Sequence, residues 1–198
     1  VAVGFGFACD SGIAFSSAPR DCVNALSGPL AHCFDDATLT QWLASGLLLD
    51  GEALAILMER GFGKWLGVES VRFVTQEETC YSIEECRDPD FARRAGGQIS
   101  VNIGNHMRRL LQAELRDGAN VISVLRGPAG EVVGHGAFTF QNTLGGRVAV
   151  VPWDAGADMA PMMDIHRATQ LKCVVEWLAG GKNTGSVEGG AWLVPQFL

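Results

Sequence analysis

The stretch "SGLLLDGEALAILMERGFGKWLG", residues 45–67, predicts a strand, a tight turn and a helix. Its continuous apolar run is typical of a strand that is buried on both faces of a parallel sheet. The helix is expected over 51–60, and Gly61 is well placed to end it in the left-handed conformation. In many α/β hydrolytic enzymes this junction carries the nucleophile, whereas here it carries Asp50. The role of Asp50 therefore decides whether this strand–helix junction is catalytic or structural.

An aspartate just before a helix accepts hydrogen bonds from the first backbone amides and is favoured by the helix dipole. Asp50 is therefore predicted to be an N-cap, and no catalytic residue is assigned. The alternative is an autonomous hydrolase that uses Asp50 with His135 or His166 as its base. His135 lies between two glycines in a predicted strand, and His166 lies at the start of a predicted helix. Each position is more typical of a structural histidine.

The segments around this junction alternate between helical and extended patterns. Asp36 is expected to cap a helix that Gly46 ends. Residues 1–35 are poorly defined and are predicted to be loops with a strand at 1–8 and one short helix near 20–26. Strands are expected at 71–75, 97–103, 120–126, 131–142 and 146–154, with a hairpin turn at 127–130.

Residues 76–96 are polar and are interrupted by proline and glycine, so they are predicted to form a surface excursion that carries partner contacts. Solvent exposure is expected for the carboxylates in it, Glu77, Glu78, Glu84 and Glu85.

A terminal amphipathic helix follows, because apolar residues recur at helical spacing. Its expected buried face is Ile165, Ala168, Leu171, Val175 and Leu178, with Arg167 and Gln170 on other faces.

Composition restricts the class of protein further. With 47% hydrophobic and 19% charged residues, the 198-residue chain is expected to fold as one globular domain. Its start at Val1 and its end in the apolar run "AWLVPQFL" suggest a fragment of a longer chain. A net charge of -7 argues against nucleic acid as a partner. No apolar run reaches the length of a membrane span, so no membrane contact is expected. The six scattered cysteines lack metal spacing and favour a reduced, cytoplasmic protein without a metal site.

Ligand-contact candidates are few. Trp153 and Asp154 follow a predicted strand, where an exposed indole can stack on a sugar ring. The glycines of "VGFGFACDSG" do not match a phosphate-binding loop, so no cofactor is expected. A small-ligand module remains an open alternative, because open α/β sheets bind ligands at the carboxyl ends of their strands.

Three segments together carry a family resemblance: "LASGLLLDGEALAILMERGFGKWLGVE", "GANVISVLRGPAGEVVGHGAFTFQNTLGGRVAVVPWD" and "HRATQLKCVVEWLAGG". In this order they resemble a class I glutamine amidotransferase-like domain, of the β-galactosidase trimerisation type that is attached to glycoside hydrolases. The likeness covers about residues 36–180.

The resemblance implies an α/β flavodoxin-like three-layer sandwich with a mostly parallel sheet and an antiparallel extension. It also implies a non-catalytic assembly or active-site-flanking domain of a carbohydrate-active protein. The expected partners are then other domains of the parent chain, further copies in a homo-oligomer, and carbohydrate. The family's elbow cysteine and late His-x-Glu pair are missing, because Asp50 and "IHRAT" stand in their places. No catalytic residue is therefore carried over.

Overall fold

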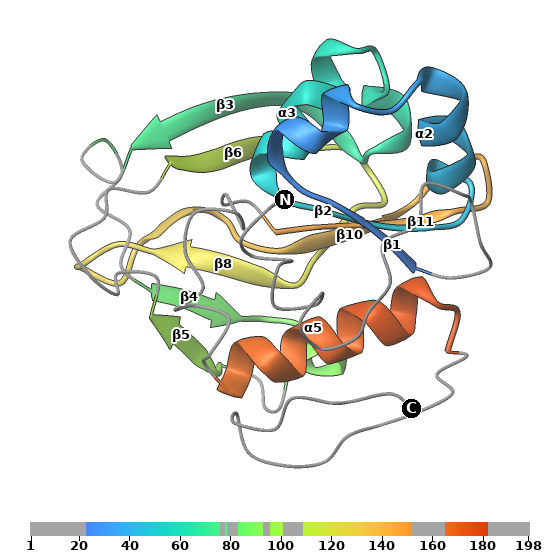
Figure 1. Ribbon diagram of the computed structural model, residues 1–198. Coiled ribbons are helices and arrows are strands. Elements are labelled where there is room, and N and C mark those ends of the chain that lie inside the picture. The colour runs from blue at the N-terminus through green and yellow to red at the C-terminus, as the bar shows by residue number, and fades with distance from the viewer. Residues whose placement is uncertain are drawn as a thin grey trace.

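The computed structural model describes residues 23–75, 78, 83–92, 96–100, 109–151 and 165–181 (Figure 1). Its centre is a five-stranded mixed sheet in the order β1-β2-β11-β10-β7. β1, β2 and β11 run parallel, and β10 and β7 join antiparallel. These strands are β1 Val23–Leu26, β2 Gly46–Leu49, β7 Asn120–Val121, β10 Phe138–Gln141 and β11 Arg147–Val150.

Two further sheets are wholly antiparallel. A two-stranded ribbon pairs β3, Val68–Thr75, with β6, Arg109–Leu115. The other sheet has the order β5-β4-β8-β9. Its strands are β4 Ile83–Cys86, β5 Gln98–Ser100, β8 Ser123–Arg126 and β9 Val132–His135. The predicted hairpin is confirmed, because β8 pairs with β9 across the turn at 127–130.

The helices cover opposite faces of the central sheet (Figure 1). On one face lie α2, Asp36–Leu43, and α3, Gly51–Glu59, and on the other lies α5, Ile165–Leu178. Short 3-10 turns are η1 Gly28–His32, η2 Gly63–Trp65 and η3 Pro89–Phe91.

The predicted double burial of β2 is confirmed by its alternating side chains. Leu47 and Leu49 pack into the core under α2 and α3, whereas Leu48 packs into the core under α5. The predicted end of α3 is also confirmed, since Gly61 has a φ of 86°.

The prediction of a flavodoxin-like, mostly parallel three-layer sandwich is wrong. The described part of the chain is richer in strand than in helix, and only the β1-β2-β11 portion is parallel. The surface excursion expected at 76–96 instead contains β4, which lies inside the four-stranded sheet. The polar sequence suggested solvent exposure, but Glu84 is buried because Ser123 and Arg167 supply it with a hydrogen bond and an opposite charge.

Three local predictions are also corrected. The cap of α2 is Asp35, whose side chain accepts from Thr38 N at 2.8 Å, and not Asp36. Gly46 begins β2 instead of ending a helix. A Cβ at Gly46 would lie 2.8 Å from the carbonyl oxygen of Leu178, so its lack of a side chain admits the end of α5. The segment near 20–26 contributes β1 where a short helix was expected.

The terminal helix is confirmed, but its buried face differs from the expected one. Arg167, Gln170, Val174 and Leu178 are buried, whereas Val175 is 38% exposed. This stripe still follows helical spacing. It contains two polar residues because the sheet below supplies partners for them.

Candidate functional site

Asp50 lies at the corner between β2 and α3 and is fully buried. Its side chain accepts from Ala53 N at 2.8 Å, which confirms the predicted N-cap. It also accepts from Ser27 Oγ at 2.5 Å, and Gly28 N lies 3.0 Å from both carboxylate oxygens. Asp50 thus joins the start of α3 to the end of β1, and its oxygens are occupied by backbone and hydroxyl donors.

The other candidates from the sequence lie on separate elements. His135 is the exposed last residue of β9, in a different sheet from the Asp50 corner. His166 is half-buried in the first turn of α5. Trp153 and Asp154 lie outside the described residues, as do the strand expected at 1–8 and the end of the one expected at 97–103.

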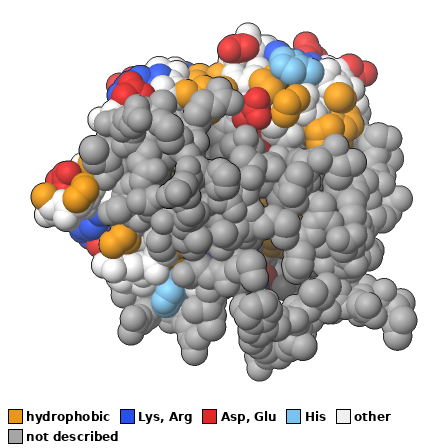
Figure 2. Space-filling model, turned by 60° about the vertical axis from the view of Figure 1, so that its left-hand side comes forward, with side chains coloured by type: hydrophobic (Ala, Val, Ile, Leu, Met, Phe, Trp, Pro, Cys, Tyr) orange, Lys and Arg blue, Asp and Glu red, His pale blue; other side chains and the backbone are white. Residues whose placement is uncertain are grey.

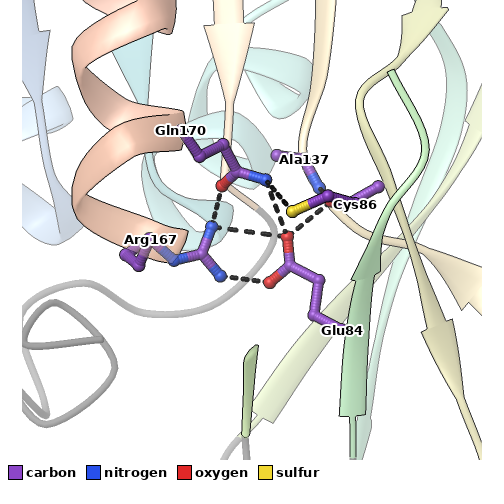
Figure 3. Close-up of polar contacts among 6 residues, drawn as sticks. Glu84, Cys86, Ala137, Arg167 and Gln170 are labelled. Carbon is purple, nitrogen blue, oxygen red and sulfur yellow. Dashed lines mark hydrogen bonds and ion pairs between the residues drawn. The ribbon is translucent and has the colours of Figure 1, made fainter. Parts of the chain in front are cut away.

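A buried polar cluster lies between α5 and the four-stranded sheet (Figure 3). The side chains of Glu84 and Arg167 are both 0% exposed, and Arg167 Nη2 donates to Glu84 Oε2. Gln170 takes part through both ends of its amide. Its oxygen accepts from Arg167 Nη1, and its nitrogen lies 3.3 Å from Glu84 Oε1.

The strands complete this cluster. Ser123 Oγ donates to Glu84 Oε1 at 2.5 Å and accepts from Ala137 N at 2.7 Å. Gln170 Nε2 also lies 3.8 Å from Cys86 Sγ. A buried carboxylate needs a paired charge and hydrogen bonds, and Glu84 has both. The cluster fastens α5 to the sheet. The sequence pattern did not predict it, because that pattern favours solvent-exposed positions for Glu84 and Arg167. The sequence "IEEC" does not alternate between apolar and polar residues, so it gave no signal that Glu84 and Cys86 share the buried face.

A groove of about 350 Å³ lies between the β3–β6 ribbon and β9. Cross-strand pairing places Ser70 opposite Glu114 and Arg72 opposite Gln112, on one face of the ribbon. Nine residues line the groove: Ser70, Val71, Arg72, Gln112, Ala113, Glu114, Val133, Gly134 and His135. One candidate from the sequence, His135, therefore belongs to this groove.

Hydrogen bonds order the side chains of the groove. Ser70 Oγ donates to Glu114 Oε2 at 2.9 Å. Arg72 Nη2 donates to Gln112 Oε1 at 2.8 Å, and Gln112 Nε2 donates to Val133 O at 3.1 Å. Gln112 therefore bridges the ribbon and β9, and it orients the guanidinium of Arg72.

Neither a cluster of metal ligands nor a membrane-spanning helix occurs in the described part of the chain. Among those residues, no three His, Cys, Asp or Glu side chains gather as metal ligands. Within the same ranges, no helix has the length and apolar character to cross a membrane. On the face drawn in Figure 2, the coloured charged side chains of both signs are interspersed with hydrophobic ones.

The structure thus defines a domain of helices, a mixed sheet and antiparallel sheets, with an open groove that polar and apolar residues line together. No protein-family model and no curated protein matches the sequence. One similar solved structure is the cytoplasmic protein STM3548 from Salmonella typhimurium, with 14% identity, a TM-score of 0.49, and coverage of 84% of this chain and 77% of that one. Another is the mmIFT52 N-terminal domain, with 14% identity, a TM-score of 0.47, and coverage of 83% and 78%. At these values neither likeness assigns a fold or a function.

Proposed function

We propose that this chain is a non-catalytic binding module whose ligand surface is the groove between the β3–β6 ribbon and β9. One observation carries the proposal. Strands that are distant in sequence bring five polar side chains to the same groove, which has the volume of a small-ligand site. The five are Ser70, Arg72, Gln112, Glu114 and His135.

Two internal networks support the non-catalytic part of the proposal. The oxygens of Asp50 accept from Ser27, Gly28 and Ala53, so its carboxylate is engaged in holding two segments together. A nucleophile needs its attacking atom exposed to a substrate and a base beside it. The carboxylate of Glu84 is likewise enclosed with Arg167.

The narrower role implied by the family resemblance is also a proposal. It is an assembly or active-site-flanking domain of a carbohydrate-active protein, in contact with other domains, further copies of the chain and carbohydrate. The module would reside in the cytoplasm, and the thiols of Cys33 and Cys173, which form no disulfide, are compatible with a reducing compartment. Sedimentation of the full-length parent tests assembly, and a strictly monomeric parent would argue against it.

Calorimetric titration with four probes tests the binding function: maltose, gluconate, glucose 6-phosphate and triglycine. We expect at least one probe to bind saturably, and Arg72→Ala and Gln112→Ala to weaken that binding. Lys172→Ala is the matched control, because Lys172 is an exposed cation on α5, away from the groove. Absence of binding by all four probes, or equal binding by the groove variants, would refute the proposal.

A further inference from the structure

Arg72 is the one Lys or Arg among the nine residues that line the groove. Its guanidinium carries five N–H donors, and Nη2 is committed to Gln112 Oε1. Its side chain is 63% exposed, and Glu78 Oε1 lies 3.8 Å from Nη1. Exposed pairs of this length contribute little, so the remaining N–H groups are available to a ligand.

The outer edge of β9 adds donors to the same groove. Gly136 N donates to Ser123 O at 2.8 Å, so backbone groups at alternate positions of β9 face β8. His135 lies opposite Val124, next to the bonded pair of Gly136 and Ser123, so its backbone groups turn away from β8. A register shift interrupts the alternation at Val133, whose carbonyl oxygen accepts from Gln112 Nε2. His135 lines the groove beside Val133 and Gly134.

Glu114 is the one carboxylate among the residues that line the groove. One of its oxygens, Oε2, accepts from Ser70, and the side chain is exposed. A carboxylate can accept several hydrogen bonds, so Glu114 still has acceptor capacity for a hydroxyl. The same charge repels an anion, which places an anionic group toward Arg72 and His135 instead.

We infer that the groove binds a small anion that also carries hydroxyl groups, a hydroxycarboxylate or a sugar phosphate. Its anionic group is held by Arg72 and His135, and a hydroxyl donates to Glu114. Arginine recognises carboxylate and phosphate in the same planar, two-pronged way, so both anions satisfy this chemistry. The inference rests on the proposed function and names the ligand class of the same groove.

Titration calorimetry at fixed pH and salt tests the ligand class with gluconate, glucose 6-phosphate, glucose, acetate and inorganic phosphate. We expect gluconate or glucose 6-phosphate to bind about tenfold or more tightly than glucose, because the anion adds charge-assisted hydrogen bonds. The comparison of gluconate with glucose 6-phosphate identifies the preferred anionic group. Each should also bind more tightly than its anion without hydroxyls, acetate or inorganic phosphate.

Two variants test separately the contact with the anionic group and the contact with the hydroxyl group. Arg72→Gln should weaken the binding of the hydroxylated anion about tenfold or more. Glu114→Gln should instead reduce the preference for gluconate over acetate, or for glucose 6-phosphate over inorganic phosphate. Lys172→Gln is the control for loss of a surface cation, and circular dichroism checks that each variant is folded.

The outcomes distinguish the two proposals. If glucose or maltose binds as tightly as the anions and Arg72→Gln has no selective effect on them, the inferred ligand class is wrong, although the groove still binds. If acetate or inorganic phosphate binds as tightly as its hydroxylated counterpart, the role of Glu114 is wrong. If no probe binds, both the inference and the proposed function fail.

Discussion

Gly136 shows how one missing side chain allows the buried cluster to close. A Cβ at this position would lie 2.3 Å from Ser123 Oγ and 3.2 Å from Glu84 Oε1. Both atoms belong to a fully buried network, so they have little room to move. Gly134, two residues earlier, has no atom closer than 3.7 Å to an added Cβ. The atoms nearest to an added Cβ at Gly136 belong to side chains, so this glycine makes room for Ser123 and Glu84.

Gly136→Ala should therefore lower the free energy of unfolding by about 1–3 kcal/mol, the usual cost of overpacking. Gly134→Ala should change it by less than about 1 kcal/mol, with a stabilising contribution from the less flexible unfolded chain. Urea denaturation of both variants provides the measurement. Equal losses for the two alanines would contradict the described packing around Ser123 and Glu84.

Asp50 and Asp35 form a matched pair of helix caps with different surroundings. Both accept from the backbone N–H of the residue three positions later, at 2.8 Å in each case. Asp50 is buried and also accepts from Ser27 and Gly28, whereas Asp35 is exposed. Asp50→Ala should reduce stability by about 2–4 kcal/mol, because it removes the helix cap and leaves buried donors without an acceptor.

Asp35→Ala should cause a smaller loss, because water can replace the lost acceptor. Thermal and urea denaturation of the two variants test this difference. If Asp50→Ala were as stable as Asp35→Ala, the structural role assigned to the buried carboxylate would be wrong.

Glu85 gives the fold a defined pH dependence. The pKa of its carboxyl is lowered below the ordinary value, chiefly by the hydrogen bond from Arg126 and also by the nearby charge of Arg87. A carboxyl whose pKa is lower when folded contributes stability above its unfolded pKa. That contribution is lost as the pH falls through the folded pKa.

Glu85→Gln should therefore be less stable than the wild type at pH 7, and the difference should shrink as the medium becomes acidic. Denaturation curves between pH 7 and pH 2 measure this trend. A difference that grows on acidification would contradict the sign of the shift.

At the scale of elements, α5 is held by polar as well as apolar contacts. Its buried stripe places Arg167 and Gln170 against Glu84 of β4, and Val174 and Leu178 in the core beside them. Removing one partner of a buried ion pair leaves an uncompensated charge, which costs about 3–5 kcal/mol. Replacing both partners by uncharged groups avoids that cost.

Glu84→Gln alone should therefore be strongly destabilising, by about 3–5 kcal/mol. The double variant Glu84→Gln with Arg167→Met should recover a clear part of that loss. A double-mutant cycle by urea denaturation gives the coupling energy. Additive effects of the two substitutions would show that the two side chains are not coupled and would contradict the described cluster.

The same elements show what local sequence can predict. The apolar run of β2, the cap at Asp50 and the stop at Gly61 depend on neighbouring residues, and the structure confirms all three. β4 and the buried face of α5 depend on each other across 83 positions of the chain, from Glu84 to Arg167. Each looks solvent-exposed when it is considered alone, because the compensating charge is distant in sequence.

The order of the strands in the sheets was the feature least predictable from the sequence. β11 adds beside β2 with Arg147 opposite Gly46, and the intervening chain forms two other sheets as well as β7 and β10 of this one. Strand patterns specify that a segment is extended, but not which distant strand pairs with it. A succession of strand and helix signals therefore favoured a parallel α/β sandwich, whereas long-range pairing produced antiparallel sheets around a mixed centre.

The groove also results from pairing between strands that are distant in sequence. His135 was a candidate from its own sequence, but Arg72, Gln112 and Glu114 were not, because only the pairing of β3 with β6 and the approach of β9 bring them together. From its local sequence alone, each of these residues is expected on a solvent-exposed face of a strand.

A map of backbone amide chemical shifts during titration shows directly whether a ligand binds in this groove. With gluconate and glucose 6-phosphate as probes, we predict that the largest changes fall on Gln112, Val133, Gly134 and His135, which line the groove. Changes concentrated on Ser27, Gly28 and Ala53 around Asp50, or no saturable change with either probe, would contradict it.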